Sequence, residues 1–272
     1  METWQARKRV GDGIIATALT RRSKALKVLL TFFLLAMAGF AQAANDIDAK
    51  VEAALAAEAR PDANRERDRN RRPLATLNFF GLKDDMRVLE LIPGGGWYTR
   101  VLAPVLADNG KLYVALGADR IKDTVLTEPG FEQVELLETT DNIHRPEGSR
   151  HYVLEDFAFG VSDLDMVLTF RNLHNFDPES RARMNSQVFK ALQAGGLYGV
   201  VDHTARHMEP ANHENRRRID PVMIIKEMLE QGFEFVDYAD LHYRADDALV
   251  YEVGRRSVTG NTDRFTMLFR KP

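Results

Sequence analysis

Two short polar segments in the C-terminal half of the chain carry residue types that suit acid–base chemistry. The segment RNLHNF, residues 171–176, contains His174, and VVDH, residues 200–203, ends in Asp202 and His203. Histidine titrates near neutral pH, so either histidine could accept a proton from a substrate, with Asp202 close by. Alternatively, both segments hold their loops in place by capping and hydrogen bonding. The residues alone leave both interpretations open.

The region after His203 also offers a metal-site interpretation. Its side chains of the kinds that bind zinc or iron are His203, His207, Glu209, His213 and Glu214. Their spacing matches no compact metal motif, and residues 205–218 (ARHMEPANHENRRR) are more typical of a mobile polar lid. We therefore predict no metal site.

Two arginine-rich segments are interpreted as solvated surface. Residues 62–73 (DANRERDRNRRP) form a dense run of mixed charge, which is more often a solvated helix or connector than a binding patch. Residues 216–218 are three consecutive arginines, which could meet an anionic substrate but fit a solvated face better.

The elements that must position these residues alternate along the chain. Short apolar runs occur at 87–93, 111–117, 134–140, 165–171 and 197–203, with helical stretches between most of them. This pattern predicts a parallel sheet covered by helices on both faces. Two helices are predicted to begin at the pairs Asp177-Pro178 and Asp220-Pro221, and LQAGG (192–196) is expected to end the first of them. The strand-like segments 233–241 and 263–272 are expected to pair antiparallel at a sheet edge.

A glycine turn follows the first predicted strand. In VLELIPGGGWYT, residues 88–99, Gly94, Gly95 and Gly96 let a ligand approach the backbone and place it near the start of the next helix. The alternative is a tight turn that binds nothing. A dinucleotide fingerprint would need a third glycine at Thr99, so a nicotinamide-dependent oxidoreductase is disfavoured.

Three segments in the same order resemble the motifs of class I S-adenosylmethionine-dependent methyltransferases. They are RVLELIPGGGWYTRVLAPVLADNGKLYVA (87–115), DMVLTFRNLHNF (165–176) and LQAGGLYGVVDH (192–203). More narrowly, the chain resembles exported, predicted methyltransferases with PGGGWYT in the first turn. The resemblance runs from the arginine-rich stretch to the C-terminus. It implies an α/β fold, Rossmann-like and doubly wound, with a mostly parallel seven-stranded sheet and an antiparallel C-terminal edge strand.

The resemblance also implies a cofactor, S-adenosylmethionine, and the residues that hold it. These are Glu90, Gly94, Gly95, Gly96, Asp119, Asp156, Arg171 and Asn172, with His174, Asp202 and His203 as the catalytic candidates. An acid beside the adenine could be Glu155 instead of Asp156.

The sequence departs from the family pattern at two positions. Ile92 stands where the first glycine is usual, and Leu116 stands where an acid usually holds the ribose. Asp119 is the nearest acid that could replace that carboxylate.

The N-terminus reads as an export signal. Residues 1–43 contain a basic stretch, the uncharged run Val28 to Ala43 and the ending Ala41-Gln42-Ala43, which together are typical of a secretory signal peptide cleaved after Ala43. An uncleaved membrane anchor is the alternative. We expect a helical extension over 44–75 and the methyltransferase-like domain over 76–272, in a periplasmic or secreted protein. The chain has no cysteine, which excludes disulfides and thiolate metal sites.

Charge narrows the partners. Residues 1–43 hold seven basic and two acidic residues, so the remaining chain has 30 basic and 38 acidic residues and a net charge of −8. Such a surface repels nucleic acid, and the expected partner is a small-molecule or envelope acceptor. Because S-adenosylmethionine is made in the cytoplasm, the alternative function is an inactive binding or accessory protein that kept the fold.

Overall fold

The computed structural model describes residues 47–139 and 143–272, which belong to one compact unit, Ile47–Pro272. The predicted signal peptide, residues 1–43, lies outside the described residues. Within the described ranges no helix is both long and apolar enough to cross a membrane.

A seven-stranded mixed sheet forms the centre of this unit, in the order β3-β2-β1-β6-β7-β9-β8. Neighbouring strands from β3 to β7 run parallel, whereas β9 is antiparallel to both β7 and β8. The strands of this sheet are β1 (Arg87–Leu91), β2 (Lys111–Ala115), β3 (Glu135–Leu136), β6 (Leu164–Phe170), β7 (Leu192–His203), β8 (Glu234–Ala239) and β9 (Arg264–Arg270). The predicted parallel sheet with antiparallel C-terminal strands is confirmed. A separate small pair, β4 (Ile143–His144) with β5 (Val153–Leu154), was not predicted.

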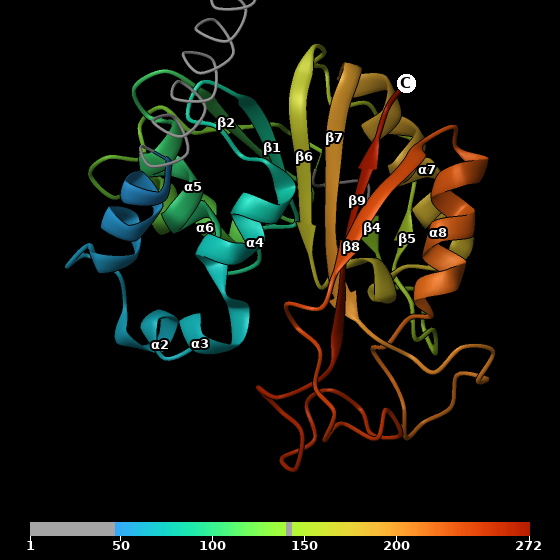
Figure 1. Ribbon diagram of the computed structural model, residues 1–272. Helices are drawn as coiled ribbons and strands as arrows, with labels where there is room; N and C mark the ends of the chain where they lie inside the picture. The colour runs from blue at the N-terminus through green and yellow to red at the C-terminus, as the bar shows by residue number, and fades with distance from the viewer. Residues whose placement is uncertain (1–46, 140–142) are drawn as a thin grey trace, which may run out of the picture. The chain divides into compact units, whose positions relative to one another are not determined.

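Helices cover both faces of the sheet (Figure 1). One apolar core joins the sheet to α7 (Pro178–Ala191) and α8 (Pro221–Glu230). The other core joins it to the helix over residues 47–56 and to α4 (Pro73–Phe80), α5 (Thr99–Leu106) and α6 (Asp119–Lys122). Three further short turns are α2 (Asp62–Arg65), α3 (Asp68–Arg71) and the 3-10 turn η1 (Val125–Thr127). The sheet is therefore the middle layer of three, as the alternating apolar runs predicted.

Both predicted helix starts are confirmed. The Asp177 carboxylate accepts a hydrogen bond from the Ser180 amide at 2.7 Å, and that of Asp220 accepts one from the Val222 amide at 2.9 Å. The predicted glycine stop is wrong. Helix α7 ends at Ala191, and Leu192 already begins β7, so the LQAGG segment lies in the strand. Gly195, with a positive φ of 81°, accompanies a register shift between β6 and β7.

Candidate functional site

Three residues of the glycine turn have a left-handed backbone, and one of them is not a glycine. Gly94 and Gly96 have φ angles of 62° and 75°, and Ile92 also lies in the left-handed region with φ 52°. A β-branched residue in that region costs roughly 1–2 kcal/mol, because its Cβ crowds the following carbonyl oxygen. The turn therefore retains a conformation that suits glycine at a position where the sequence supplies isoleucine.

The three glycines have different surroundings. A Cβ atom added at Gly94 or Gly95 would meet no atom within 4 Å, whereas one at Gly96 would lie 2.8 Å from Val125 Cγ2. Gly96 thus allows η1 to pack closely against the turn. Gly94 and Gly95 leave open space beside the backbone, which a bound ligand can occupy.

Asn172 connects the glycine turn to the segment after β6. Its side-chain amide donates to the carbonyl oxygens of Leu91 and Ile92 at 3.2 and 3.3 Å. The predicted cofactor residue Glu90 is buried at the end of β1 and accepts a hydrogen bond from Thr99 Oγ at 2.7 Å. Burial raises the pKa of Glu90 to about 7, against the opposing influence of the Thr99 hydrogen bond and the Arg71 charge.

The end of β2 offers a less complete site. Leu116, at the position where the resemblance places a ribose-binding acid, has no carboxylate. Its φ is positive, at 63°, and its amide donates to Thr139 Oγ at 3.0 Å. Asp119 is exposed at the start of α6. Asp156 is exposed and lies 3.3 Å from Arg183 of α7. Neither acid lines the cavity described below.

His174 and Asp202 form a buried pair where the carboxyl ends of β6 and β7 meet. His174, in the short turn η3 (Leu173–Asn175), places Nδ1 2.5 Å from Asp202 Oδ1. Asp202 also accepts from the backbone amides of His174 and His203, at 3.1 and 2.7 Å. In the tautomer in which Nδ1 donates to this carboxylate, Nε2 carries no proton and can accept one. The structure thus brings two of the three predicted catalytic residues into contact.

His203 lies beside this pair but differs from it. Its ring centre is 5.5 Å from that of His174, and its Nδ1 lies 2.9 Å from Thr262 Oγ. Burial, together with the charges of His174, Arg264, Arg171 and Arg218, holds the pKa of His203 well below its usual value. The ring is therefore neutral, and His203 is a weaker base than the sequence analysis expected.

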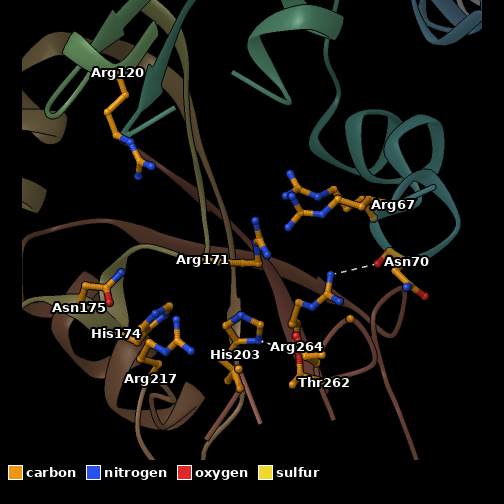
Figure 2. A pocket seen from close by; sticks show the side chains of 15 residues that line it. Arg67, Asn70, Arg120, Arg171, His174, Asn175, His203, Arg217, Thr262 and Arg264 are labelled. Atoms are coloured by element: carbon orange, nitrogen blue, oxygen red, sulfur yellow. Dashed lines mark hydrogen bonds between the residues drawn. The ribbon is translucent and has the colours of Figure 1, made fainter. Parts of the chain in front are cut away.

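A cavity of about 460 Å³ opens onto His174 and His203 (Figure 2). Six of its fifteen lining residues are arginines, and none is Asp or Glu. The arginines are Arg67, Arg71, Arg120, Arg171, Arg217 and Arg264. A second cavity of about 480 Å³ shares His174, Asn175, Arg217 and Gly254 with the first. His174 therefore lies between two basic cavities.

Most of these arginines are not predicted as site residues from the sequence. Arg171 was predicted to bind the cofactor, but Arg67 and Arg71 were interpreted as solvated, and Arg264 was not singled out. For Arg71 the solvated interpretation is wrong, because only 6 % of the residue is exposed. The available signal was the density of arginine in residues 65–72, but nothing local shows that this segment folds over the carboxyl ends of the strands.

The residues of the alternative metal site do not gather. His203 faces the cavity, whereas His207 Nδ1 lies 2.8 Å from Asp220 Oδ2. In residues 47–139 and 143–272, no group of three or more His, Asp and Glu side chains could hold a metal ion.

The fold is that of methyltransferases with a Rossmann-like sheet. The chain is similar to a SAM-dependent methyltransferase from Aquifex aeolicus, with a TM-score of 0.52 and 14 % identity over 76 % of this chain and 93 % of that chain. The chain is less similar to human N-acetylserotonin methyltransferase in complex with SAM, with a TM-score of 0.48 and 14 % identity over 77 % of this chain and 53 % of that chain. Aeropyrum pernix fibrillarin with bound S-adenosyl-L-methionine gives a TM-score of 0.45 at 17 % identity, over 72 % of this chain and 73 % of that chain. No protein-family profile and no curated protein sequence matches the chain.

Proposed function

We propose that the protein is an S-adenosylmethionine-dependent methyltransferase that acts on a small-molecule or envelope acceptor. The observation that carries this proposal is the connection between two parts of the site. Asn172 holds the glycine turn through the carbonyls of Leu91 and Ile92, and two residues later His174 pairs with Asp202. A turn that can admit a cofactor and a group that can accept a proton are thus fixed to each other.

The first turn fits the cofactor better than the end of β2 does. Gly94 and Gly95 leave room for a ligand beside the backbone, and we assign them, with Glu90, to its binding. Binding of the cofactor's ribose depends on Asp119, whose exposed side chain is accessible to a ligand. Direct contact with the cofactor remains a prediction for four other residues, namely Gly96, Arg171, Asn172 and Asp156.

The chemistry requires alignment and the removal of one proton. The cofactor supplies an electrophilic methyl group. When bound, the cofactor would give this methyl group to the acceptor, with cleavage of its carbon–sulfur bond and departure of S-adenosylhomocysteine. His174 takes the proton of the acceptor on Nε2. Asp202 keeps the imidazole oriented and stabilises the charge that the ring acquires.

We also propose that the protein is exported and works in the periplasm or outside the cell. Residues 1–43 support this by their basic stretch, apolar run and Ala41-Gln42-Ala43 ending. A fusion of residues 1–50 to a reporter that matures only outside the cytoplasm tests it. A reporter that matures supports export, and one that stays inactive while the fusion accumulates contradicts it.

A second candidate function is a binding protein that kept the fold and lost the reaction. Two observations favour it, namely the isoleucine at position 92 and the lack of a carboxylate at Leu116. Calorimetric titration of residues 44–272 with S-adenosylmethionine and S-adenosylhomocysteine separates the two functions. The methyltransferase proposal predicts micromolar binding of both.

One variant makes this titration specific to the glycine turn. Gly95→Val adds a side chain where no protein atom lies within 4 Å of the new Cβ, so the fold should be retained while the ligand space is filled. We expect at least a tenfold loss of affinity with little change in the thermal midpoint. Binding of neither ligand to the folded wild-type protein would reject the methyltransferase and favour the second candidate.

A further inference from the structure

Five of the six arginines that line the cavity have no carboxylate partner among the described residues, namely Arg120 and the four that we call the arginine cluster. Arg67, Arg71, Arg171 and Arg264 form no ion pair within residues 47–139 and 143–272, in contrast to Arg217, which pairs with Glu252. Figure 2 shows the side chains of Arg67, Arg171 and Arg264 reaching the same space from three separate segments. Positive groups gathered in this way repel one another unless an anion lies between them.

Arg71 is buried and held firmly in this position. Its guanidinium carbon lies 4.4 Å from the centre of the Trp97 ring, and its carbonyl oxygen accepts a hydrogen bond from His242 Nε2 at 2.9 Å. Trp97 is itself anchored, since its indole nitrogen donates to the carbonyl of Asn64 at 2.9 Å. No side-chain hydrogen bond of Arg71 to a described residue balances the loss of water around its guanidinium.

Arg264 and Arg171 approach from the sheet. Arg264 is only 6 % exposed; its Nη1 donates to the carbonyl of Asn70 at 3.0 Å, while its buried Nε has no partner in the described chain. Arg171 follows β6 with a left-handed φ of 65° and donates its backbone amide to Val201 at 2.6 Å. A buried, unsatisfied Nε and a strained backbone both cost stability, and such costs concentrate at binding sites.

The charges act on one another. Burial and the Arg171 charge lower the pKa of Arg71 to about 8, with smaller contributions from Arg67 and Arg264, while the Tyr98 hydroxyl opposes this shift. Burial and Arg171 likewise lower the pKa of Arg264 to about 10. The carboxylate that interacts with Arg71, Glu90, is itself buried and hydrogen-bonded by Thr99. Asp202, whose charge acts on Arg171, is likewise held by His174. No described carboxylate therefore forms an ion pair with the four arginines.

We propose that this arginine cluster binds the phosphate group of a small-molecule ligand, which under the proposed function is the methyl acceptor. Four unpaired guanidinium groups carry more charge than a single carboxylate neutralises, whereas a phosphate ester or diphosphate carries two or more negative charges. Guanidinium groups also bind phosphate oxygens in pairs, with a planar fork. The phosphate then lies in the same cavity as His174, so that the rest of the ligand can reach the His174–Asp202 pair.

Titration of the purified protein with pyrophosphate and with inorganic phosphate, in calorimetry at constant ionic strength, tests this inference. Acetate and citrate serve as carboxylate probes with one and three charges. We expect pyrophosphate to bind most tightly and to raise the thermal midpoint.

Two arginines at opposite ends of β9 provide a matched pair of variants. Arg264→Met removes a cavity arginine, whereas Arg270→Met removes an exposed arginine that pairs with Glu234. We expect Arg264→Met to lose at least tenfold in affinity for pyrophosphate and Arg270→Met to bind like the wild type. Arg71→Met provides a second cavity variant, and circular dichroism confirms that each variant is folded.

Three results would overturn the inference. They are no binding of either phosphate probe, tighter binding of citrate than of pyrophosphate, and an equal loss in the two β9 variants. Binding to phosphatidylglycerol vesicles without binding of soluble pyrophosphate would assign the cluster to a membrane surface and also reject the small-molecule ligand. These titrations contain no cofactor. They can therefore support the phosphate site even if the methyltransferase proposal is rejected, and they can reject the phosphate site while the methyltransferase proposal is supported.

Discussion

The glycine turn and the arginine cluster lie at the same edge of one sheet, yet they differ in how the chain builds them. The turn is continuous in sequence, from β1 into α5, and it has left-handed backbone at Gly94, Gly96 and also at Ile92. The cluster is assembled from α3, the end of β6 and the start of β9, and it depends on side-chain charge. The glycine turn is thus defined by its backbone conformation, whereas the arginine cluster is defined by its positive charge.

Both regions carry a cost to stability that a ligand could offset. In the turn the cost is a left-handed isoleucine, and in the cluster it is the burial of guanidinium groups without a carboxylate. A chain that only needed to fold could relieve both by ordinary substitutions. We infer that each cost is retained because the region binds something.

The largest expected effect concerns the His174–Asp202 pair, whose histidine lines the same cavity as the arginine cluster. His174→Ala removes the base, so turnover should fall by about 10²–10⁴-fold while cofactor affinity stays within twofold of wild type, roughly the range for loss of a general base. The measurement is release of S-adenosylhomocysteine with an acceptor found among phosphate-bearing compounds. Unchanged turnover in His174→Ala would remove the proton-accepting role from this histidine.

A smaller effect is expected at Glu90, beneath the glycine turn. Its pKa is raised by burial from 4.5 to about 7, so between these values the folded state binds more protons than the unfolded state. Stability should therefore fall as the pH rises from 4.5 to 7, by roughly 2–3 kcal/mol from this group. Glu90→Gln should remove that loss, and thermal midpoints of both proteins at pH 5 and pH 8 measure it. A wild-type midpoint that falls no more than that of Glu90→Gln would contradict the raised pKa.

The smallest effect is expected from the cluster in the absence of ligand. Arg71→Met keeps an apolar side chain against Trp97 and removes a buried charge, so the free energy of unfolding should rise by about 2 kcal/mol. That corresponds to a thermal midpoint higher by roughly 4–8 °C for a domain of this size. A midpoint below that of the wild type would show that Arg71 is a structural residue and not a strained, ligand-binding one.

The glycine turn, which is continuous in sequence, could be predicted from the sequence. The arginine cluster, which is assembled from distant segments, could not. Apolar runs and capping aspartates predicted the sheet and both helix starts, because strands and caps depend on neighbouring residues. His174, Asp202 and His203 could be brought together because the carboxyl ends of parallel strands share one edge. The burial of Arg71 could not be predicted, since it depends on Trp97 and His242, which lie far from it in sequence. The helix α7 ends directly before the predicted segment 192–196, but the glycine cap expected there is absent because the chain passes straight into β7.

The most direct test of the two-region account is the affinity for S-adenosylmethionine measured with and without pyrophosphate. The cofactor carries a positive sulfonium, which the unpaired arginines repel and a bound anion would shield. We predict that saturating pyrophosphate tightens cofactor binding severalfold in the wild type and has no effect in Arg71→Met. If pyrophosphate instead weakens cofactor binding, the two ligands compete for one site, and the account of two adjoining regions is wrong.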